Sequence, residues 1–417
     1  MTSRSRLRAF FFTTYKYDIG VYIVPKHVFD GQDWTTFKHF DLEKKWPVST
    51  GPWQVVDASP QQKVFDRRPS WWAAERKLAP LPVVERNIWL PNLGEQQTAQ
   101  ALITNQLDAG TGLQPATFPT VFGQNPKIII HSGKEKPYGY LDWWPISLYV
   151  NNEREPFNDR DVRWALSYYI NRPQLIEVGY LGANTPSKLP LPPYPPLQPY
   201  FDAVKDLLAK YDTNEFAPKK GDSLLQGKGY KKDSAYWTGG DGKRLAVNII
   251  GFGAAGPAMG PVLVEMFKRH GVDASMALPP DFDDRFQKGE YDGAIYGHGG
   301  SVNEPYATLR LYQGASIAVP GAHQANFARW KNAEYDKLVD EAYGTRPDNV
   351  KQLADIWRRA MEIWLPDLPD IQLVQNIHRI PWNTTYWKNW PTESNAYVNG
   401  AHWHLTFAMV LWNLQSA

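Results

Sequence analysis

The sequence has 417 residues, of which 43% are hydrophobic and 14% aromatic, and a formal net charge of +2. A chain of this length exceeds one ordinary hydrophobic core, so we expect two domains. The balanced charge, without a basic block, argues against a nucleic-acid partner. The absence of cysteine excludes disulfides, thiolate metal sites and a cysteine nucleophile.

The N-terminal stretch MTSRSRLRAFFFTTYKYDIG places arginines before a short apolar run at Phe10, Phe11 and Phe12. That run is too short for the apolar region of a signal peptide. No stretch approaches the ~18 apolar residues of a membrane span. The sequence as written therefore predicts a soluble chain without an export signal.

The first third of the chain is expected to be rich in β-structure. Strands are predicted at 51–56, 62–66 and 83–90. A helix is predicted from Glu95 to Leu107, and Asp108-Ala109-Gly110 closes it.

The middle of the chain begins with a strand predicted over 147–150. Asn158 or Asp159 is expected to cap a helix that runs to Asn171. The proline-dense segment 189–200 is predicted to be an extended surface segment, because proline donates no ladder hydrogen bonds.

The second half alternates strands and helices. A strand is predicted at 245–250 and a helix at 257–270, with Gly271 at the helix end. Helices are expected from Asn332 to Tyr343 and over the amphipathic stretch 350–365. The sequence returns to a β-like, aromatic pattern from Ile371, so the mixture predicts α/β domains without an internal repeat.

Residues 251–256, G-F-G-A-A-G, spell a dinucleotide fingerprint between a predicted strand and helix. In a true site the glycines let a pyrophosphate reach the helix N-terminus. The pattern alone is weak evidence, and the surrounding sequence lacks repeated strand–helix–strand halves. We therefore rank a nucleotide-binding dehydrogenase below the two functional hypotheses that follow.

Two other clusters could carry chemistry. His402 and His404 could place two imidazoles on one side of a strand, but further metal ligands at a fixed spacing are missing. Asp281, Asp283 and Asp284 could supply the acid pair of a glycoside hydrolase. Since aspartates also favour the first turn of a helix, a solvated helix start explains them better.

Several stretches, in order along the chain, form motifs of one protein family. The most specific is Asn151–Asp159, N-N-E-R-E-P-F-N-D, followed by D-V-R-W-A-L at 161–166 and I-N-R at 170–172. The other matching stretches are S-T-G-P-W at 49–53, R-R-P-S-W-W at 67–72, the helix end at 101–109 and N-A-E-Y-D-K-L-V at 332–339. Together they resemble the motifs of the ABC-importer solute-binding proteins of the oligopeptide/dipeptide/nickel type, family 5.

This resemblance implies an α/β, two-lobed periplasmic-binding-protein-like fold with a hinge and an inter-lobe cleft. Lobe I is expected at 1–145, completed by the return segment 373–417, and lobe II at 146–372, with hinges near 146–151 and 373–379. Full family members begin with an export signal and a further N-terminal stretch. Lobe I is therefore expected to be incomplete, with apolar surface uncovered, and a periplasmic location follows from the family alone.

The turn within 291–312 corresponds to the family's turn at the mouth of the cleft. Relatives that bind peptides usually present a tryptophan there, then an aspartate that pairs with the peptide's α-ammonium group. Here His298 and Ser301 stand at those two positions, so a neutral or blocked ligand is expected. The candidate ligand-binding residues are His298, Gly299, Gly300, Ser301, Asn303, Tyr306 and Trp53.

The resemblance implies a non-enzymatic binding protein. It would capture an oligopeptide or oligosaccharide-type solute and deliver it to an ABC permease in the membrane, with no cofactor, metal or nucleic acid. The enzyme alternative is a carbohydrate-active hydrolase that uses the tryptophan-rich surface and an acid pair.

Overall fold

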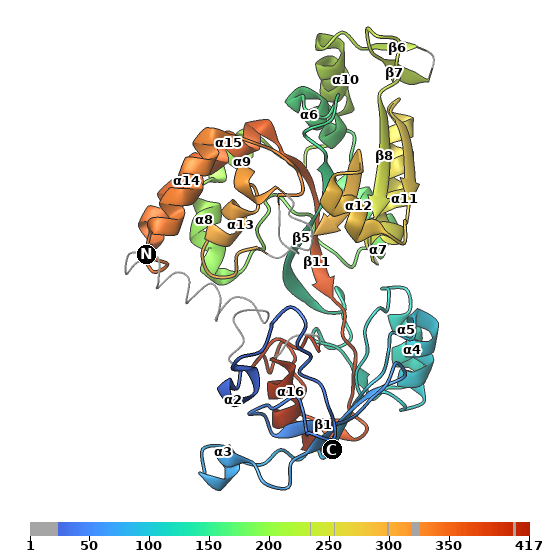
Figure 1. Cartoon of the computed structure of the whole chain (residues 1–417). Coiled ribbons are helices and arrows are strands. Elements are labelled where there is room, and N and C mark those ends of the chain that lie inside the picture. The colour runs from blue at the N-terminus through green and yellow to red at the C-terminus, as the bar shows by residue number, and fades with distance from the viewer. Residues whose placement is uncertain (1–23, 234, 254, 298–299, 318–325, 403–405) are drawn as a thin grey trace. The chain divides into compact units, whose positions relative to one another are not determined.

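The computed structural model describes residues 24–233, 235–253, 255–297, 300–317, 326–402 and 406–417. The chain divides into two compact units. Unit 1 is Leu141–Ile377, and the described part of unit 2 is 24–140 together with His378–Ala417. Each unit has a sheet and a hydrophobic core of its own (Figure 1).

Unit 1 is built on a five-stranded sheet with strand order β11-β5-β10-β8-β9. Its strands are β5 (Tyr140–Val150), β8 (Ala246–Gly251), β9 (Asp273–Ala277), β10 (Gly293–Gly297) and β11 (Asp370–His378). β8 is parallel to both β9 and β10, whereas β5 is antiparallel to β10. A small hairpin of β6 (Lys231–Asp233) and β7 (Tyr236–Thr238) extends this unit.

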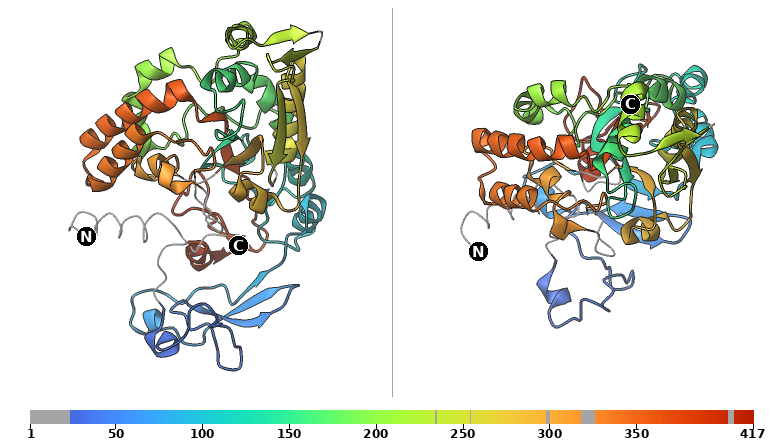
Figure 2. Two further views of the ribbon diagram at one scale, coloured as in Figure 1. Left: turned by 45° about the horizontal axis from the view of Figure 1, so that its top comes forward. Right: turned by 90° about the horizontal axis from the view of Figure 1, so that it is seen from above.

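The helices of unit 1 pack around this sheet, with α11 along β8 and α14 beside α15 (Figures 1 and 2). They are α6 (Arg160–Tyr168), α7 (Arg172–Tyr180), α8 (Gln198–Asp202), α9 (Lys205–Lys210), α10 (Pro218–Gly227), α11 (Ala255–Arg269), α12 (Phe282–Lys288), α13 (Tyr306–Arg310), α14 (Ala333–Gly344) and α15 (Val350–Asp367), with short 3-10 turns at Pro195–Leu197 and Gly314–Ser316.

Unit 2 contains an antiparallel sheet of β1 (Trp53–Ala58), β2 (Lys63–Arg67) and β3 (Arg86–Trp89). Its other elements are α2 (Lys26–Phe29), α3 (Trp72–Glu75), α4 (Glu95–Ile103), α5 (Phe118–Gln124), β4 (Ile128–Ile129), β12 (Trp382–Asn383), β13 (Trp387–Lys388), α16 (Phe407–Asn413) and β14 (Gln415–Ser416).

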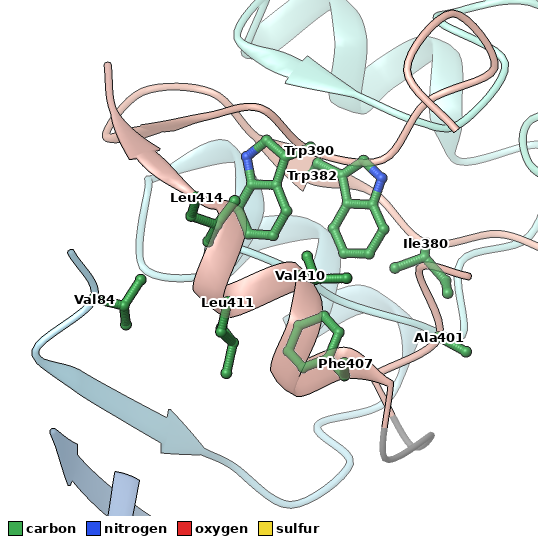
Figure 3. Packing of buried hydrophobic residues seen from close by; sticks show 9 residues of the cluster. All are labelled: Val84, Ile380, Trp382, Trp390, Ala401, Phe407, Val410, Leu411 and Leu414. Atoms are coloured by element: carbon green, nitrogen blue, oxygen red, sulfur yellow. The ribbon is translucent and has the colours of Figure 1, made fainter. Parts of the chain in front are cut away.

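The largest core of unit 2 joins the tail of the chain to the first strands. Val410 lies on the side of α16 that faces the indoles of Trp382 and Trp390, whereas Leu411 points away from them (Figure 3). These two indoles stack with centroids 4.9 Å apart and planes 7° from parallel. Offset stacking of such large rings adds to the free energy of burial, so the tail stabilises unit 2.

Most predicted elements are confirmed. Asp159 caps α6 by accepting from the backbone N–H of Asp161, and Asn332 caps α14 by accepting from Glu334 and Tyr335. The strand predicted at 147–150 begins earlier, at Tyr140. The sequence reasoning did not identify α7 or α16.

The prediction for the proline-dense segment 189–200 is wrong. Leu189, Leu191, Leu197 and Tyr200 are fully buried, and the chain becomes helical from Pro195 onward. Proline suits the first turn of a helix, where its missing N–H costs nothing. The apolar residues between the prolines then pack into the core of unit 1.

Asp370 is a fully buried acid at the start of β11 and predicts a pH-dependent stability. Tyr312 and Gln372 each donate to its carboxylate at 2.9 Å, yet burial raises the pKa of Asp370 to about 6. The folded state therefore holds this proton more tightly than the unfolded state. The resulting contribution to stability is complete near pH 4 and is lost as the pH rises through 6.

Between pH 4 and pH 6, the unfolding free energy of the wild type should fall by about 2–3 kcal/mol more than that of Asp370→Asn. Denaturant titrations of the wild type and the variant at pH 4, 5 and 6 measure this difference. Parallel pH profiles for the two proteins would contradict this assignment.

Candidate functional site

The carboxyl edge of the unit 1 sheet is the candidate site. β8, β9 and β10 run in parallel and end at this edge. β5 passes this edge at Ile146, which pairs with Gly297 at the end of β10. β11 lies beside β5, and its Gln372 donates to Ser147 of β5 at 2.9 Å. Ligands of open α/β sheets bind beyond the carboxyl ends of the strands.

Aromatic side chains gather at this edge. The ring of Tyr296 lies 5.8 Å from that of Trp144 and 5.6 Å from that of Phe252. Phe252 is 43% exposed although it is large and apolar. Burial raises the pKa of Tyr296 to about 12, so its phenol stays neutral. The edge therefore presents neutral aromatic surface to a ligand.

A second layer of rings holds these side chains in place. Phe282 and Phe286 of α12 contact Tyr296 at 5.7 and 4.9 Å between centroids. Phe327 stacks on Phe286 at 4.2 Å. Because these supporting rings are packed on several sides, the exposed aromatic residues rest on a preorganised base.

The turn after β10 was expected to contact the ligand. His298 and Gly299 lie outside the described residues. A Cβ on Gly300 would lie 2.4 Å from the hydroxyl of Thr308. The backbone of Gly300 therefore approaches α13, which accounts for the glycine without a ligand.

Ser301 is fully buried and exchanges two hydrogen bonds with Thr308. Its backbone N–H donates to the Thr308 hydroxyl at 2.9 Å, and its own hydroxyl accepts from the Thr308 N–H at 3.1 Å. This reciprocal pair fixes the turn to the start of α13. The serine hydroxyl thus has a structural partner within the protein.

The remaining candidate residues fall in different surroundings. Asn303 is exposed at the turn. Tyr306 is buried in α13, with its ring 5.4 Å from that of Tyr343. Trp53 belongs to unit 2, where its indole N–H donates to Val84 at 3.0 Å and its ring packs on the core. The structure thus places Trp53 and Tyr306 in packing roles.

Gly251 and Gly256 of the 251–256 fingerprint serve strand–helix packing. A Cβ on Gly251 would lie 2.8 Å from the Cα of Gly256. Strand β8 and helix α11 therefore approach at van der Waals distance. This close contact explains both glycines without a bound nucleotide.

The aspartates considered for hydrolysis begin α12. Asp281 pairs with Arg285 at 2.9 Å and Asp284 with Lys288 at 2.7 Å, each one helical turn away. The Arg285 hydrogen bond holds the pKa of Asp281 below its usual value. Acids paired in this way on a helix surface give no support to an acid–base role.

His404 of the candidate pair His402 and His404 lies outside the described residues. Among the residues that the structure describes, no cluster of three or more His, Cys, Asp or Glu could hold a metal ion. In the same part of the chain, no helix has the length and hydropathy required to cross a membrane.

Sequence reasoning did not identify Trp144 and Phe252 as candidate site residues. Trp144 precedes the strand that the sequence predicts from Ser147. The fingerprint pattern assigns no role to Phe252, because only its glycines are specified. A usable signal was available, because a large apolar residue directly after a buried strand lies at the sheet edge.

The model of the family "Bacterial extracellular solute-binding proteins, family 5 Middle" matches residues 12–318. Heme-binding protein A of Haemophilus influenzae is 27% identical over 77% of this chain and 54% of its own length. Di/tripeptide-binding protein 1 of Pseudomonas aeruginosa is 23% identical over 80% of this chain and 56% of its own length. The chain thus spans about half the length of these relatives.

Solved structures show the same fold. A mannohexaose-bound periplasmic oligopeptide-binding protein from Thermotoga maritima matches with a TM-score of 0.78 and 22% identity, covering 94% of this chain and 73% of its own. NikZ from Campylobacter jejuni, in complex with Ni(L-His), matches with a TM-score of 0.70 and 18% identity, covering 90% of this chain and 69% of its own.

Proposed function

The chain belongs to the bacterial extracellular solute-binding proteins of family 5 and has their two-lobed fold; on this premise we propose that it captures a solute outside the cytoplasm for an ABC permease. The solute class is an oligopeptide or an oligosaccharide. The aromatic carboxyl edge of unit 1, with Trp144, Phe252 and Tyr296, is the observation that carries the proposal.

Neutral aromatic rings favour a ligand with flat or apolar faces, such as sugar rings or uncharged side chains. The names of the relatives support both solute classes, since they include a di/tripeptide-binding protein and a protein with bound mannohexaose. The protein binds its solute without chemical change, and the paired acids of α12 fit that role.

The solute is held without an ion pair between its α-ammonium group and residue 301. A buried ammonium needs a carboxylate, because an unpaired buried charge costs several kcal/mol. Ser301 is neutral, and its hydroxyl already accepts from Thr308. Asn303, exposed at the same turn, offers hydrogen bonds to a polar but uncharged group.

A thermal-shift screen of the full chain tests this function with oligopeptides, their N-acetylated forms and manno-oligosaccharides. A solute that binds only the folded state raises its stability, by about 2.7 kcal/mol at one hundred times the dissociation constant. We expect stabilisation by at least one class, and less than a tenfold difference in affinity between free and acetylated peptides. Preference for the free amine by more than tenfold, or about 1.4 kcal/mol, would contradict the proposed recognition.

A further inference from the structure

Unit 2 contains a pocket of about 580 Å³ that the proposed function does not use. Its volume falls within the usual range of small-molecule sites, about 300–1,000 Å³. Among its lining residues are Trp89 at the end of β3, Trp387 and Trp390 from the tail, and Phe407 of α16. Several walls of the pocket are therefore aromatic.

The acid of this pocket is Asp108. No hydrogen bond or ion pair to its carboxylate is formed by the part of the chain that the structure describes, and the side chain is reachable by solvent. Its backbone oxygen accepts from the N–H of Asn383 at 2.8 Å. The oxygen of Asn383 in turn accepts from the indole N–H of Trp390 at 3.1 Å. The backbone of Asn383 thus links the segment of Asp108 to the indole of Trp390.

The other titratable side chains that line the pocket leave the charge of Asp108 uncompensated. Arg86 is bound by Asp66 through two hydrogen bonds of 2.6 and 2.7 Å. Burial lowers the pKa of His402 to about 4, so this imidazole is neutral at pH 7.

We propose that the unit 2 pocket binds an organic cation, with an ammonium head beside Asp108 and an apolar body against the tryptophans. The faces of aromatic rings carry negative potential and attract ammonium groups, with tryptophan the strongest. A nearby carboxylate adds an attractive opposite charge. The lining residues of this pocket differ from those of the carboxyl edge of unit 1, so either proposal can fail without the other.

Calorimetric titration of the full chain with choline tests the proposal, with the uncharged isostere 3,3-dimethylbutan-1-ol as the matched ligand. We expect choline to bind and the alcohol to bind at least tenfold more weakly. Asp108→Asn should weaken choline binding at least tenfold. Glu75→Gln, which removes an exposed acid of unit 2 outside the pocket, should leave it unchanged.

Trp387→Leu provides a second variant, because Trp387 is only partly buried and its loss should spare the fold. We expect weaker choline binding with an unchanged melting temperature in the absence of ligand. Equal binding of choline and the alcohol would overturn the proposal, and so would undiminished choline binding by Asp108→Asn. Absence of choline binding to the folded wild type would also overturn it.

Discussion

Arg172→Met is expected to lower the free energy of unfolding by about 3 kcal/mol or more. Arg172 is fully buried, and its guanidinium donates to the backbone oxygens of Gln372, Ser167 and Ile170 at 2.8–3.3 Å. Methionine fills a similar volume but donates nothing, so several buried oxygens lose their donors. Burial of the charged guanidinium lowers the pKa of Arg172 to about 9. Removal of this buried charge offsets only part of that loss.

Arg160→Met is the matched control, because Arg160 is exposed and its guanidinium lies 3.9 Å from the carboxylate of Asp161. Its unfolding free energy should stay within about 0.5 kcal/mol of the wild type. Urea titrations of the three proteins measure both effects. Equal stability of the Arg172 and Arg160 variants would show that the buried network contributes little.

Replacement of either Phe252 or Trp144 by alanine is expected to weaken solute binding about ten- to a hundredfold, which is about 1.4–2.7 kcal/mol of binding free energy. Phe252 is largely exposed at the carboxyl edge, and Trp144 packs near it through Tyr296. A solute that stacks on these rings loses both the buried area and the ring contact. Calorimetric titration with the solute found by the thermal screen gives the dissociation constants.

Phe216→Ala controls for the removal of exposed aromatic surface, since Phe216 is 45% exposed in unit 1 and contacts His270 away from the edge. Its affinity for the solute should match that of the wild type. If all three variants bind equally well, the solute does not occupy the edge, and the site assignment fails.

The family motifs could be recognised in the sequence, but their roles required the structure. Arg163 of the D-V-R-W-A-L stretch is buried and donates to the backbone oxygens of Phe157, Asp367 and Leu368. In unit 2, Trp71 of R-R-P-S-W-W donates to Thr50 of S-T-G-P-W at 2.8 Å. These motif residues hold each unit together, so a motif match predicts the fold better than the ligand.

The local elements were predictable where a cap or an amphipathic pattern was present, as for Asp159 and Asn332. The site was less predictable, because three-dimensional pairing decides which residues meet. Phe252 and Trp144 are more than one hundred positions apart in sequence, and the antiparallel register of β5 and β10 brings their strands to one edge. The sequence predicts a ligand contact at Ser301, whereas the structure bonds its hydroxyl and its N–H to Thr308.

We propose that the protein binds its solute and releases it chemically unchanged. The mass of a solute recovered from the complex tests this proposal. The full chain is incubated for hours with excess solute from the thermal screen, the complex is isolated by gel filtration, and the solute is released by denaturation and weighed by mass spectrometry. The account predicts one solute per chain, with its mass intact and no loss from the free pool. Shortened peptides or sugars that accumulate with time, and do so only with folded protein, would contradict it.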